Sequence, residues 1–154
     1  MKKNTKNFNS SIIVLNYNTG PFVRACLDSI LTAVKNSKYK HEIIVVDNAS
    51  RDESAKIVEA EYPSVKLIKN KTNKFIFGLL DGYLQARFRY VFFLNNDISM
   101  DKNFLDRVLE NFEDFQVFAV TGKILDIKNG KTQGAQTKLR FKYQMLGYEN
   151  IIPG

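Results

Sequence analysis

The sequence predicts a doubly wound α/β fold, in which helices cover both faces of a mostly parallel sheet. Short β-branched runs alternate along the chain with segments of helical apolar periodicity. The first two runs, SIIVL at residues 11–15 and EIIVV at residues 42–46, are apolar on both faces, as is typical of central parallel strands. Each run also ends abruptly at polar residues, where such sheets bind ligands.

Length and composition agree with one domain of this class. The chain has 154 residues, of which 44% are hydrophobic and 25% are charged. A chain of about 150 residues buries roughly 70% of its unfolded surface. Neither an internal repeat nor a Pro/Gly/Ser-rich linker divides the sequence. We therefore predict a polar leader at residues 1–9 and a single α/β domain at residues 10–154.

The first helix is expected between the first two strands. Phe22, Cys26 and Ile30 recur every four residues on one apolar face, and Pro21 suits the first turn of a helix. We interpret Cys26 as core filling, because a buried free cysteine behaves as a small hydrophobic residue.

A capping box precedes the second helix. Ser50 is followed three residues later by Glu53, a spacing at which the two side chains cap backbone N–H groups reciprocally. Pro63 then ends the helix, because proline cannot continue it. The buried stripe between these signals consists of Ile57, Val58 and Tyr62.

Two more strands and two more helices complete the alternation. A weaker third strand is predicted at residues 65–68 and a strong fourth at 90–94, with a helix at 77–88 between them. Asp101 suits the N-cap of the last helix, at residues 103–112.

The remainder of the chain predicts an antiparallel edge and an aromatic tail. Short apolar runs at 118–121 and 124–127 precede the turn dipeptide Asn129-Gly130. Residues 141–152 then interleave aromatic and aliphatic residues with basic ones. We expect an apolar surface there, through which the chain forms a homodimer or contacts a partner chain.

Composition and charge exclude several classes of protein. One cysteine cannot form an intramolecular disulfide, and one histidine beside it cannot complete a His/Cys zinc cluster. An excess of 23 Lys+Arg over 16 Asp+Glu gives a net charge of +7, which favours polyanions: nucleic acid, anionic lipid or phosphorylated small molecules. We expect a cytoplasmic protein, with peripheral attachment to the inner face of the membrane left open.

The polar residues that follow the strands are the candidates for chemistry. In open parallel sheets, ligands bind beyond the carboxyl ends of the strands, and a strand order of 3-2-1-4 would put the crevice between the first and fourth strands. Any one of these polar stops also suits a simple turn, but three of them converge on one edge. They are Asn16, Tyr17 and Asn18; Asp47 and Asn48; and Asn95, Asn96 and Asp97.

Several kinds of site lack their sequence signals. The segment NYNTGP after the first strand has one glycine where a dinucleotide-binding fingerprint needs three, and the chain has no P-loop motif. A G-x-S-x-G nucleophile elbow is also missing from the sequence. His41 precedes the second strand, at the wrong edge of the sheet for catalysis, and is interpreted as structural.

The amides and carboxylates that remain suit a nucleotide and one hard cation. Asp97 is the strongest candidate ligand for Mg²⁺ or Mn²⁺, because these ions prefer oxygen donors and often bind one or two carboxylates plus phosphate oxygens. Such a cation offsets charge on a departing diphosphate. Four lysines near the third strand suit either phosphate contact or a solvated face; they are Lys66, Lys69, Lys71 and Lys74.

Three motifs together resemble a known family. SIIVLNYNTG, EIIVVDNASRDES and VFFLNNDIS occur in the order and at the separations found in family-2 glycosyltransferases with a GT-A-type, Rossmann-like fold. The resemblance extends from about residue 10 to at least residue 134, where KNGKTQGAQ is similar to the segment after the metal motif.

The resemblance implies roles for matching positions. Tyr17 and its neighbours would line the base pocket, Asp47 would bond the uracil or other base, and Asn73 would lie near the nucleotide. Asp97 stands in a relaxed Asp-x-Asp motif and would be the metal ligand. The predicted nucleotide-binding residues are Asn16, Tyr17, Asn18, Asp47, Asn48, Asn73, Asn95 and Asn96.

The sequence departs from the family in two places. Phe75 stands where the family's first glycine is expected after the third strand, and Asp81 lies near an expected asparagine. The family's catalytic base lies well downstream of the metal motif, which implies a base beyond Gly154 and leaves the catalytic residue unassigned. The acceptor-binding half of the fold therefore looks truncated. The chain would then be an excised N-terminal portion, a naturally shortened protein, or a donor-binding module that another chain completes.

The implied function is transfer of a sugar from a nucleoside diphosphate donor, favouring UDP or dTDP sugars, to a glycan, lipid-linked or protein acceptor. The resemblance implies metal assistance, inversion at the anomeric carbon, and a role in cell-surface polysaccharide biosynthesis. The alternative is a non-catalytic nucleotide-sugar-binding or assembly module that lacks the base. Nucleic-acid binding rests on the charge of +7 alone and is not expected.

Overall fold

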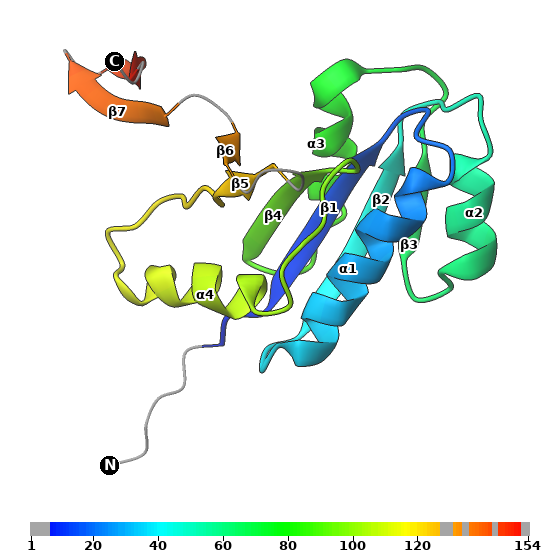
Figure 1. The fold of residues 1–154 in the computed structure, drawn as a ribbon, viewed down its shortest axis with the longest axis horizontal. Helices are drawn as coiled ribbons and strands as arrows, with labels where there is room; N and C mark the ends of the chain where they lie inside the picture. The colour runs from blue at the N-terminus through cyan, green and yellow to red at the C-terminus, as the bar shows by residue number, and fades with distance from the viewer. Residues whose placement is uncertain (1–6, 127–130, 134–135, 143–144, 152–154) are drawn as a thin grey trace. The chain divides into compact units, whose positions relative to one another are not determined.

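A parallel sheet of four strands, in the order β3-β2-β1-β4, forms the centre of the fold (Figure 1). The computed structural model describes residues 7–126, 131–133, 136–142 and 145–151. This is the 3-2-1-4 order that would put a ligand crevice between the first and fourth strands. The strands are β1 (Ser10–Asn16), β2 (His41–Asp47), β3 (Lys66–Lys69) and β4 (Tyr90–Asn95).

Helices connect the strands and cover both faces of the sheet, which confirms the predicted fold class. They are α1 (Phe22–Asn36), α2 (Ser54–Glu61), α3 (Gly78–Tyr83) and α4 (Phe104–Glu110), with short 3₁₀ turns η1 (Phe75–Phe77) and η2 (Asn111–Glu113). Among the described residues, no helix is long and apolar enough to cross a membrane.

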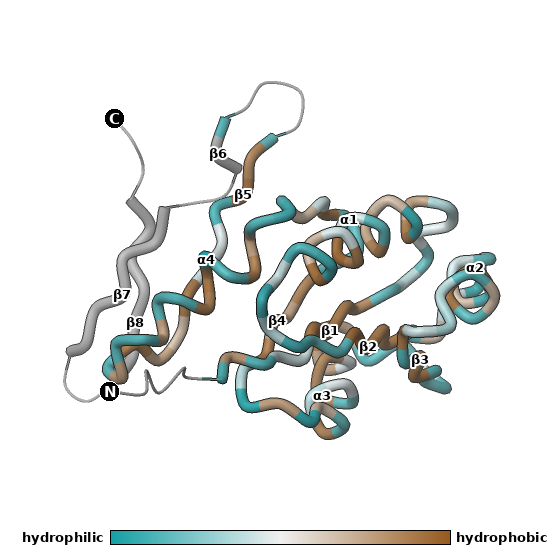
Figure 2. Tube along the Cα trace, turned by 90° about the horizontal axis from the view of Figure 1, so that it is seen from below, coloured by the Kyte–Doolittle hydropathy of each residue, from teal (hydrophilic) through white to brown (hydrophobic). Residues whose placement is uncertain are grey.

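The two faces of the sheet are covered unequally. Alternate residues of β1 point to opposite sides, so that Ile12 packs with α1, α2 and α4 in the larger core, while Ile13 packs with Ile44 and Val46 in a smaller one. Figure 2 shows α1 and α3 on opposite sides of the sheet. In the described part of the chain, α3 is the only helix over the smaller core, whose partly buried members include Leu79 and Ala86.

Two details of the helices differ from the sequence predictions. Phe22, expected on the buried face of α1, is 74% exposed, because Val23, Cys26 and Leu27 form that face. The predicted helix at 77–88 ends at Tyr83.

The predicted capping box does not form. The helix begins at Ser54, and Glu53 makes no capping hydrogen bond. Asp52 caps instead, since its Oδ1 accepts the Ser54 N–H at 3.0 Å. Ser50 is recruited into long-range contacts with Asn16 and Asn18, which a local motif cannot anticipate.

The chain divides into two units, residues 1–118 and 119–154. In the second unit, β5 (Ile124–Leu125) pairs antiparallel with β6 (Thr132–Gln133), and β7 (Gln136–Lys142) pairs antiparallel with β8 (Met145–Ile151). Residues 124–125 form a strand as expected, but its partner is β6 in a separate two-stranded sheet, so the antiparallel edge expected from residues 118–121 and 124–127 is wrong. The predicted turn at 129–130 lies outside the described residues.

Two expectations for the C-terminal region have different outcomes. Residues 118–121 are irregular, so the strand predicted there is wrong. The side chains of residues 132–154 lie outside those that the structure describes, so the apolar surface expected at 141–152 stays a prediction. The single domain predicted for residues 10–154 also stays a prediction.

Candidate functional site

The carboxyl ends of β1, β2 and β4 bring the predicted polar residues together. Asn16 is in register with Asp47 on the neighbouring strand. On the other side, Leu15 is in register with Asn95, so that Asn96 follows directly at the end of β4. Residues separated by about thirty and fifty positions in sequence therefore meet at one edge, as expected for a parallel sheet.

Asn16 is the centre of a buried polar network at this edge. Its side chain is fully buried, and its Nδ2 lies 2.8 Å from Asp47 Oδ1 and 2.9 Å from Ser54 Oγ. Its Oδ1 accepts hydrogen bonds from Thr19 Oγ1 at 2.7 Å and Asn96 Nδ2 at 2.8 Å. One amide thus ties together the loops that follow three different strands.

Asp47 is held inside this network. It is 4% exposed, and its two carboxylate oxygens accept from Asn16 Nδ2 and from the Ser50 N–H, the latter at 3.1 Å. A carboxylate offers about four acceptor positions, so two are used. Direct contact between Asp47 and a base stays a prediction, and the contacts present give Asp47 a role in shaping the loop after β2.

Asn48 organises a second cluster, around the loop after β3. Its Nδ2 donates to Asn73 Oδ1 at 2.7 Å and to the Phe75 carbonyl at 2.9 Å. Its Oδ1 accepts the Lys74 N–H at 3.0 Å. Asn48 itself is 1% exposed, and its bonds tie a buried side chain to the half-buried loop after β3.

Phe75 is in an unusual conformation within this loop. Its φ is +51°, in the left-handed region that favours glycine, and its side chain is 76% exposed. This is the position where the family resemblance led us to expect glycine. Asn48 Nδ2 donates to the Phe75 carbonyl, and Asn73 Oδ1 accepts the Phe75 N–H at 2.7 Å. These two bonds hold the strained turn in place.

Other predicted residues present groups to solvent. Tyr17 is 44% exposed, and Asn18, Asn95 and Asp97 are also exposed. The backbone of Asn18 is fixed by a hydrogen bond from its N–H to Ser50 Oγ at 3.1 Å, and its φ of +50° is one that asparagine tolerates. Tyr17 and Asn18 directly follow the buried Asn16, and Asn95 and Asp97 flank the buried Asn96.

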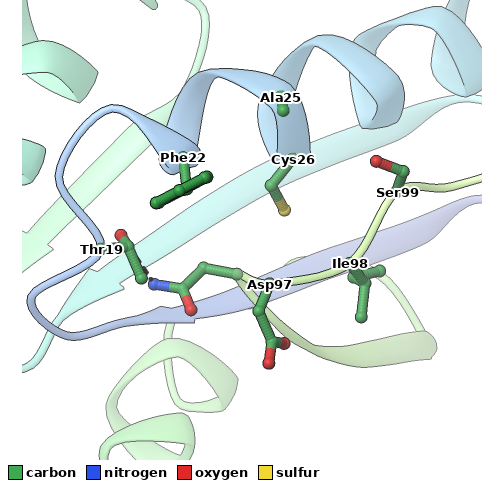
Figure 3. A pocket seen from close by; sticks show the side chains of 8 residues that line it. Thr19, Phe22, Ala25, Cys26, Asp97, Ile98 and Ser99 are labelled. Carbon is green, nitrogen blue, oxygen red and sulfur yellow. Dashed lines mark hydrogen bonds between the residues drawn. The ribbon is translucent and has the colours of Figure 1, made fainter. Parts of the chain in front are cut away.

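A pocket of about 250 Å³ opens beside Asp97 (Figure 3). Phe22 and Cys26 project into it from α1, while the carboxylate of Asp97 points away from α1. Burial raises the pKa of the Cys26 thiol to about 11, so the thiol stays protonated and acts as core filling, as predicted. The lining residues are Thr19, Phe22, Ala25, Cys26, Asn96, Asp97, Ile98 and Ser99.

The donor set near Asp97 fits a hard cation only in part. No group of three or more His, Cys, Asp or Glu side chains gathers in the described residues. Asp97 itself is exposed and has neither a hydrogen bond nor an ion pair with the described part of the chain. One free carboxylate suits an ion that takes its remaining ligands from phosphate and water.

Two of the lysines near the third strand form ion pairs. Lys69 pairs with Glu59 at 2.7 Å and Lys74 with Asp81 at 2.9 Å, so two of the four candidate phosphate contacts are engaged in ion pairs.

His41 begins β2 at the opposite edge, where its ring nitrogens lie 2.7 Å from the hydroxyls of Ser10 and Ser37. Burial lowers the pKa of His41, which confirms its structural interpretation.

Sequence reasoning missed the hydroxyls of the network. Thr19, Ser50 and Ser54 supply partners to Asn16, and Asp52 Oδ2 accepts the Gly20 N–H at 2.6 Å. Their signal was the density of small polar residues just after each strand, where loops that close over a site are built.

Comparison with known proteins gives a family and a set of similar folds. The model for glycosyl transferase family 2 matches residues 11–152. No curated protein matches the chain. S. aureus TarS is similar in structure: for its residues 1–349 the TM-score is 0.58 at 24% identity, covering 69% of this chain and 32% of that one.

Two ligand complexes of TarS residues 1–349 show the same similarity. The complex with UDP-GlcNAc has a TM-score of 0.59 at 24% identity and covers 69% of this chain and 31% of that one. The complex with UDP has a TM-score of 0.60 at 25% identity, with coverage of 69% and 32%. The chain therefore matches about a third of the length of these TarS structures.

Proposed function

The chain belongs to glycosyl transferase family 2, and from that premise we propose that the carboxyl edge of its sheet is the donor site for a nucleoside diphosphate sugar. The observation that carries the proposal is the buried network around Asn16, which fixes three loops while leaving the Asp97 carboxylate exposed beside them. A rigid polar edge with one free anion suits a metal-bound diphosphate. The similarity to a UDP-GlcNAc complex of TarS supports a uridine nucleotide, with dTDP sugars as the second choice.

We assign the predicted residues to two roles. The buried residues position the loops, with Asp47 also reaching the base, and the exposed or half-buried ones contact the nucleotide, with Tyr17 stacking on the base and Asn18 beside it. Asp47 keeps two acceptor positions for a base N–H, and Asn73 forms part of the wall through its bond to Asn48. The positioning residues are Asn16, Asp47, Asn48 and Asn96; the contact residues are Tyr17, Asn18, Asn73, Asn95 and Asp97.

Asp97 would hold Mg²⁺ or Mn²⁺. Such an ion supplies positive charge to the diphosphate when it is bound. Asp97 has no competing cation in the described residues, while the amide of Asn96 beside it is fixed by Asn16 and Thr19. The carboxylate is thus attached to an ordered strand end and available to a ligand.

The full activity that we propose is transfer of the sugar, with inversion, to a glycan, lipid-linked or protein acceptor. A second candidate is a nucleotide-sugar-binding module without turnover. The contacts of the other carboxylates at this edge favour the binding module. Asp47 and Asp52 accept internal hydrogen bonds, and Asp81 forms an ion pair with Lys74. None of these three is free to act as a general base.

Calorimetric titration with UDP tests the donor site. Wild type and Asp97→Asn are each titrated with Mn²⁺ present and with chelator, and Asp101→Asn serves as a control because Asp101 is also exposed but lies beyond the edge. Losing a charge-assisted contact of about 1.5–3 kcal/mol corresponds to roughly ten- to hundredfold weaker binding. We expect Mn²⁺ to tighten binding to wild type and Asp101→Asn only.

The same experiment separates the competing outcomes. Equal affinities in all titrations would remove Asp97 from the site, and no UDP or dTDP binding in any titration would contradict the donor-site proposal. Donor hydrolysis and transfer assays on the same protein then distinguish the enzyme from the binding module.

A further inference from the structure

Asp81, on helix α3, binds both ends of the loop of residues 70–74, here called the β3 loop. Its two carboxylate oxygens each accept a hydrogen bond from Lys74 Nζ at 2.9 Å, and its Oδ2 also accepts one from Asn70 Nδ2 at 2.9 Å. These contacts with Lys74 and Asn70 lower the pKa of the Asp81 carboxyl, so the group stays charged at neutral pH. One side chain of α3 thus closes the β3 loop through a charged group.

Helix α3 also lies close to the buried amide of Asn48. Gly78, the first residue of α3, is buried, and a Cβ added there would lie 2.9 Å from Asn48 Oδ1. The same oxygen accepts the Lys74 N–H at 3.0 Å and a hydrogen bond from Asn70 Nδ2 at 3.2 Å. The two loop residues that Asp81 binds are therefore bonded to Asn48 as well.

The β3 loop held in this way carries one wall of the candidate site. Asn73 Oδ1 accepts from Asn48 Nδ2 at 2.7 Å and from the Phe75 N–H at 2.7 Å. The left-handed conformation of Phe75, with a φ of +51°, persists only where surrounding bonds enforce it. Displacement of the β3 loop would therefore move Asn73, which we place beside the nucleotide.

We propose that Asp81 is a positioning residue of the donor site, because it holds the β3 loop against Asn48 and so keeps Asn73 in place for the nucleotide. The inference rests on the proposed function. It holds whatever covers the exposed apolar residues of α3, since the contacts that carry it join residues 48–81 of this chain. The side chains of Lys74 and Asp81 are 44% and 26% exposed, and such pairs contribute little to global stability, so the expected effect is local.

Amide hydrogen exchange in the full chain, followed by NMR, tests the positioning without a ligand. The Lys74 and Phe75 amides donate to side chains of Asn48 and Asn73, so their exchange reports on the β3 loop. We expect Asp81→Ala to speed both by about fivefold or more. Asp81→Asn retains an oxygen that can accept from Asn70 or Lys74, and it should speed them less.

The control variant is Glu110→Ala. It removes the ion pair between Glu110 and Lys38, which has the same length of 2.9 Å and also lies at the surface. Lys38 lies between α1 and β2, before the start of the second strand, and so at the opposite edge of the sheet from the candidate site. This variant should leave the exchange of the Lys74 and Phe75 amides at the wild-type rate.

Titration with UDP in the presence of Mn²⁺ then connects the β3 loop to the donor site. We expect Asp81→Ala to bind UDP about five- to tenfold more weakly than wild type, Asp81→Asn to fall between them, and Glu110→Ala to equal wild type. In an Asn73→Ala background, Asp81→Ala should cause little further loss, because both changes act through Asn73.

Wild-type exchange rates for the Lys74 and Phe75 amides in Asp81→Ala would overturn the proposal, and so would wild-type affinity for UDP in that variant. Equal losses of affinity with and without Asn73→Ala would also overturn it, since Asp81 would then act by another route. Failure of the wild-type chain to bind UDP is a different outcome: it would contradict the donor site itself, and this inference with it.

Discussion

Phe75 offers a test of the loop that forms one wall of the candidate site. Its φ of +51° places an L-residue in the left-handed region, which costs about 1–2 kcal/mol for any residue with a Cβ. Glycine avoids this strain but loses about 0.5–1 kcal/mol more than alanine through chain entropy. We therefore expect Phe75→Gly to be more stable than Phe75→Ala by roughly 0.5–1 kcal/mol.

The matched control is two residues away. Phe77 is 74% exposed, close to the 76% of Phe75, but its φ is −66°. At Phe77 we expect the ordinary order, with the alanine variant more stable than the glycine variant by about 0.5–1 kcal/mol. Both pairs of variants lose an exposed ring, so each comparison cancels the effect of the ring itself.

Urea unfolding, followed by far-UV circular dichroism, measures all four variants. A free energy of unfolding that is higher for glycine at position 75 and for alanine at position 77 supports the reasoning. If alanine is the more stable residue at both positions, the left-handed conformation of Phe75 and the role of Asn48 in holding it are wrong.

Three further predictions concern the sheet and its two edges. Gly82→Ala should destabilise the fold by about 1–3 kcal/mol, because the new Cβ would lie 2.5 Å from Ile13 Cγ2; stabilisation on urea unfolding would contradict the close approach of α3. Asn16→Asp places a second carboxylate beside Asp47, because Asn16 Nδ2 lies 2.8 Å from Asp47 Oδ1. The free energy of unfolding at pH 7 should fall by about 2–4 kcal/mol, and the loss should be smaller near pH 4, where a carboxylate can be protonated. The control Asn18→Asp, at an exposed position, should change stability little. The lowered pKa of His41 means that the unfolded chain binds the proton more readily, so stability should fall as pH drops below about 6.5; an unchanged pH profile in His41→Gln would contradict this.

The sheet and the position of the site follow closely from the sequence. Runs that are apolar on both faces identify β1 and β2, and the rule for parallel sheets brings Asn16, Asp47 and Asn96 to one edge. Local sequence patterns do not predict which of these polar groups form hydrogen bonds with one another. The bond from Asn48 to Asn73 spans 25 residues, and no spacing rule predicts that it shapes the loop after β3.

The errors share one physical cause, which is that tertiary contacts override local signals. Ser50 has the spacing of a capping box, yet its hydroxyl accepts hydrogen bonds from Asn16 and Asn18 instead. The helix predicted at 77–88 ends at Tyr83, and its fully buried positions are Gly78 and Gly82. Periodicity identifies a helix but does not say which side of it is covered.

Paramagnetic broadening of backbone amide signals by Mn²⁺ tests the central claim most directly. With UDP present, substoichiometric Mn²⁺ should broaden the amides of residues 95–99, at the end of β4, and of residues 17–20, after β1. The amides around His41, at the opposite edge of the sheet, should stay sharp, and Asp97→Asn should abolish the selective effect. Broadening that is scattered over the surface, or unchanged in Asp97→Asn, would contradict a metal-dependent donor site at this edge.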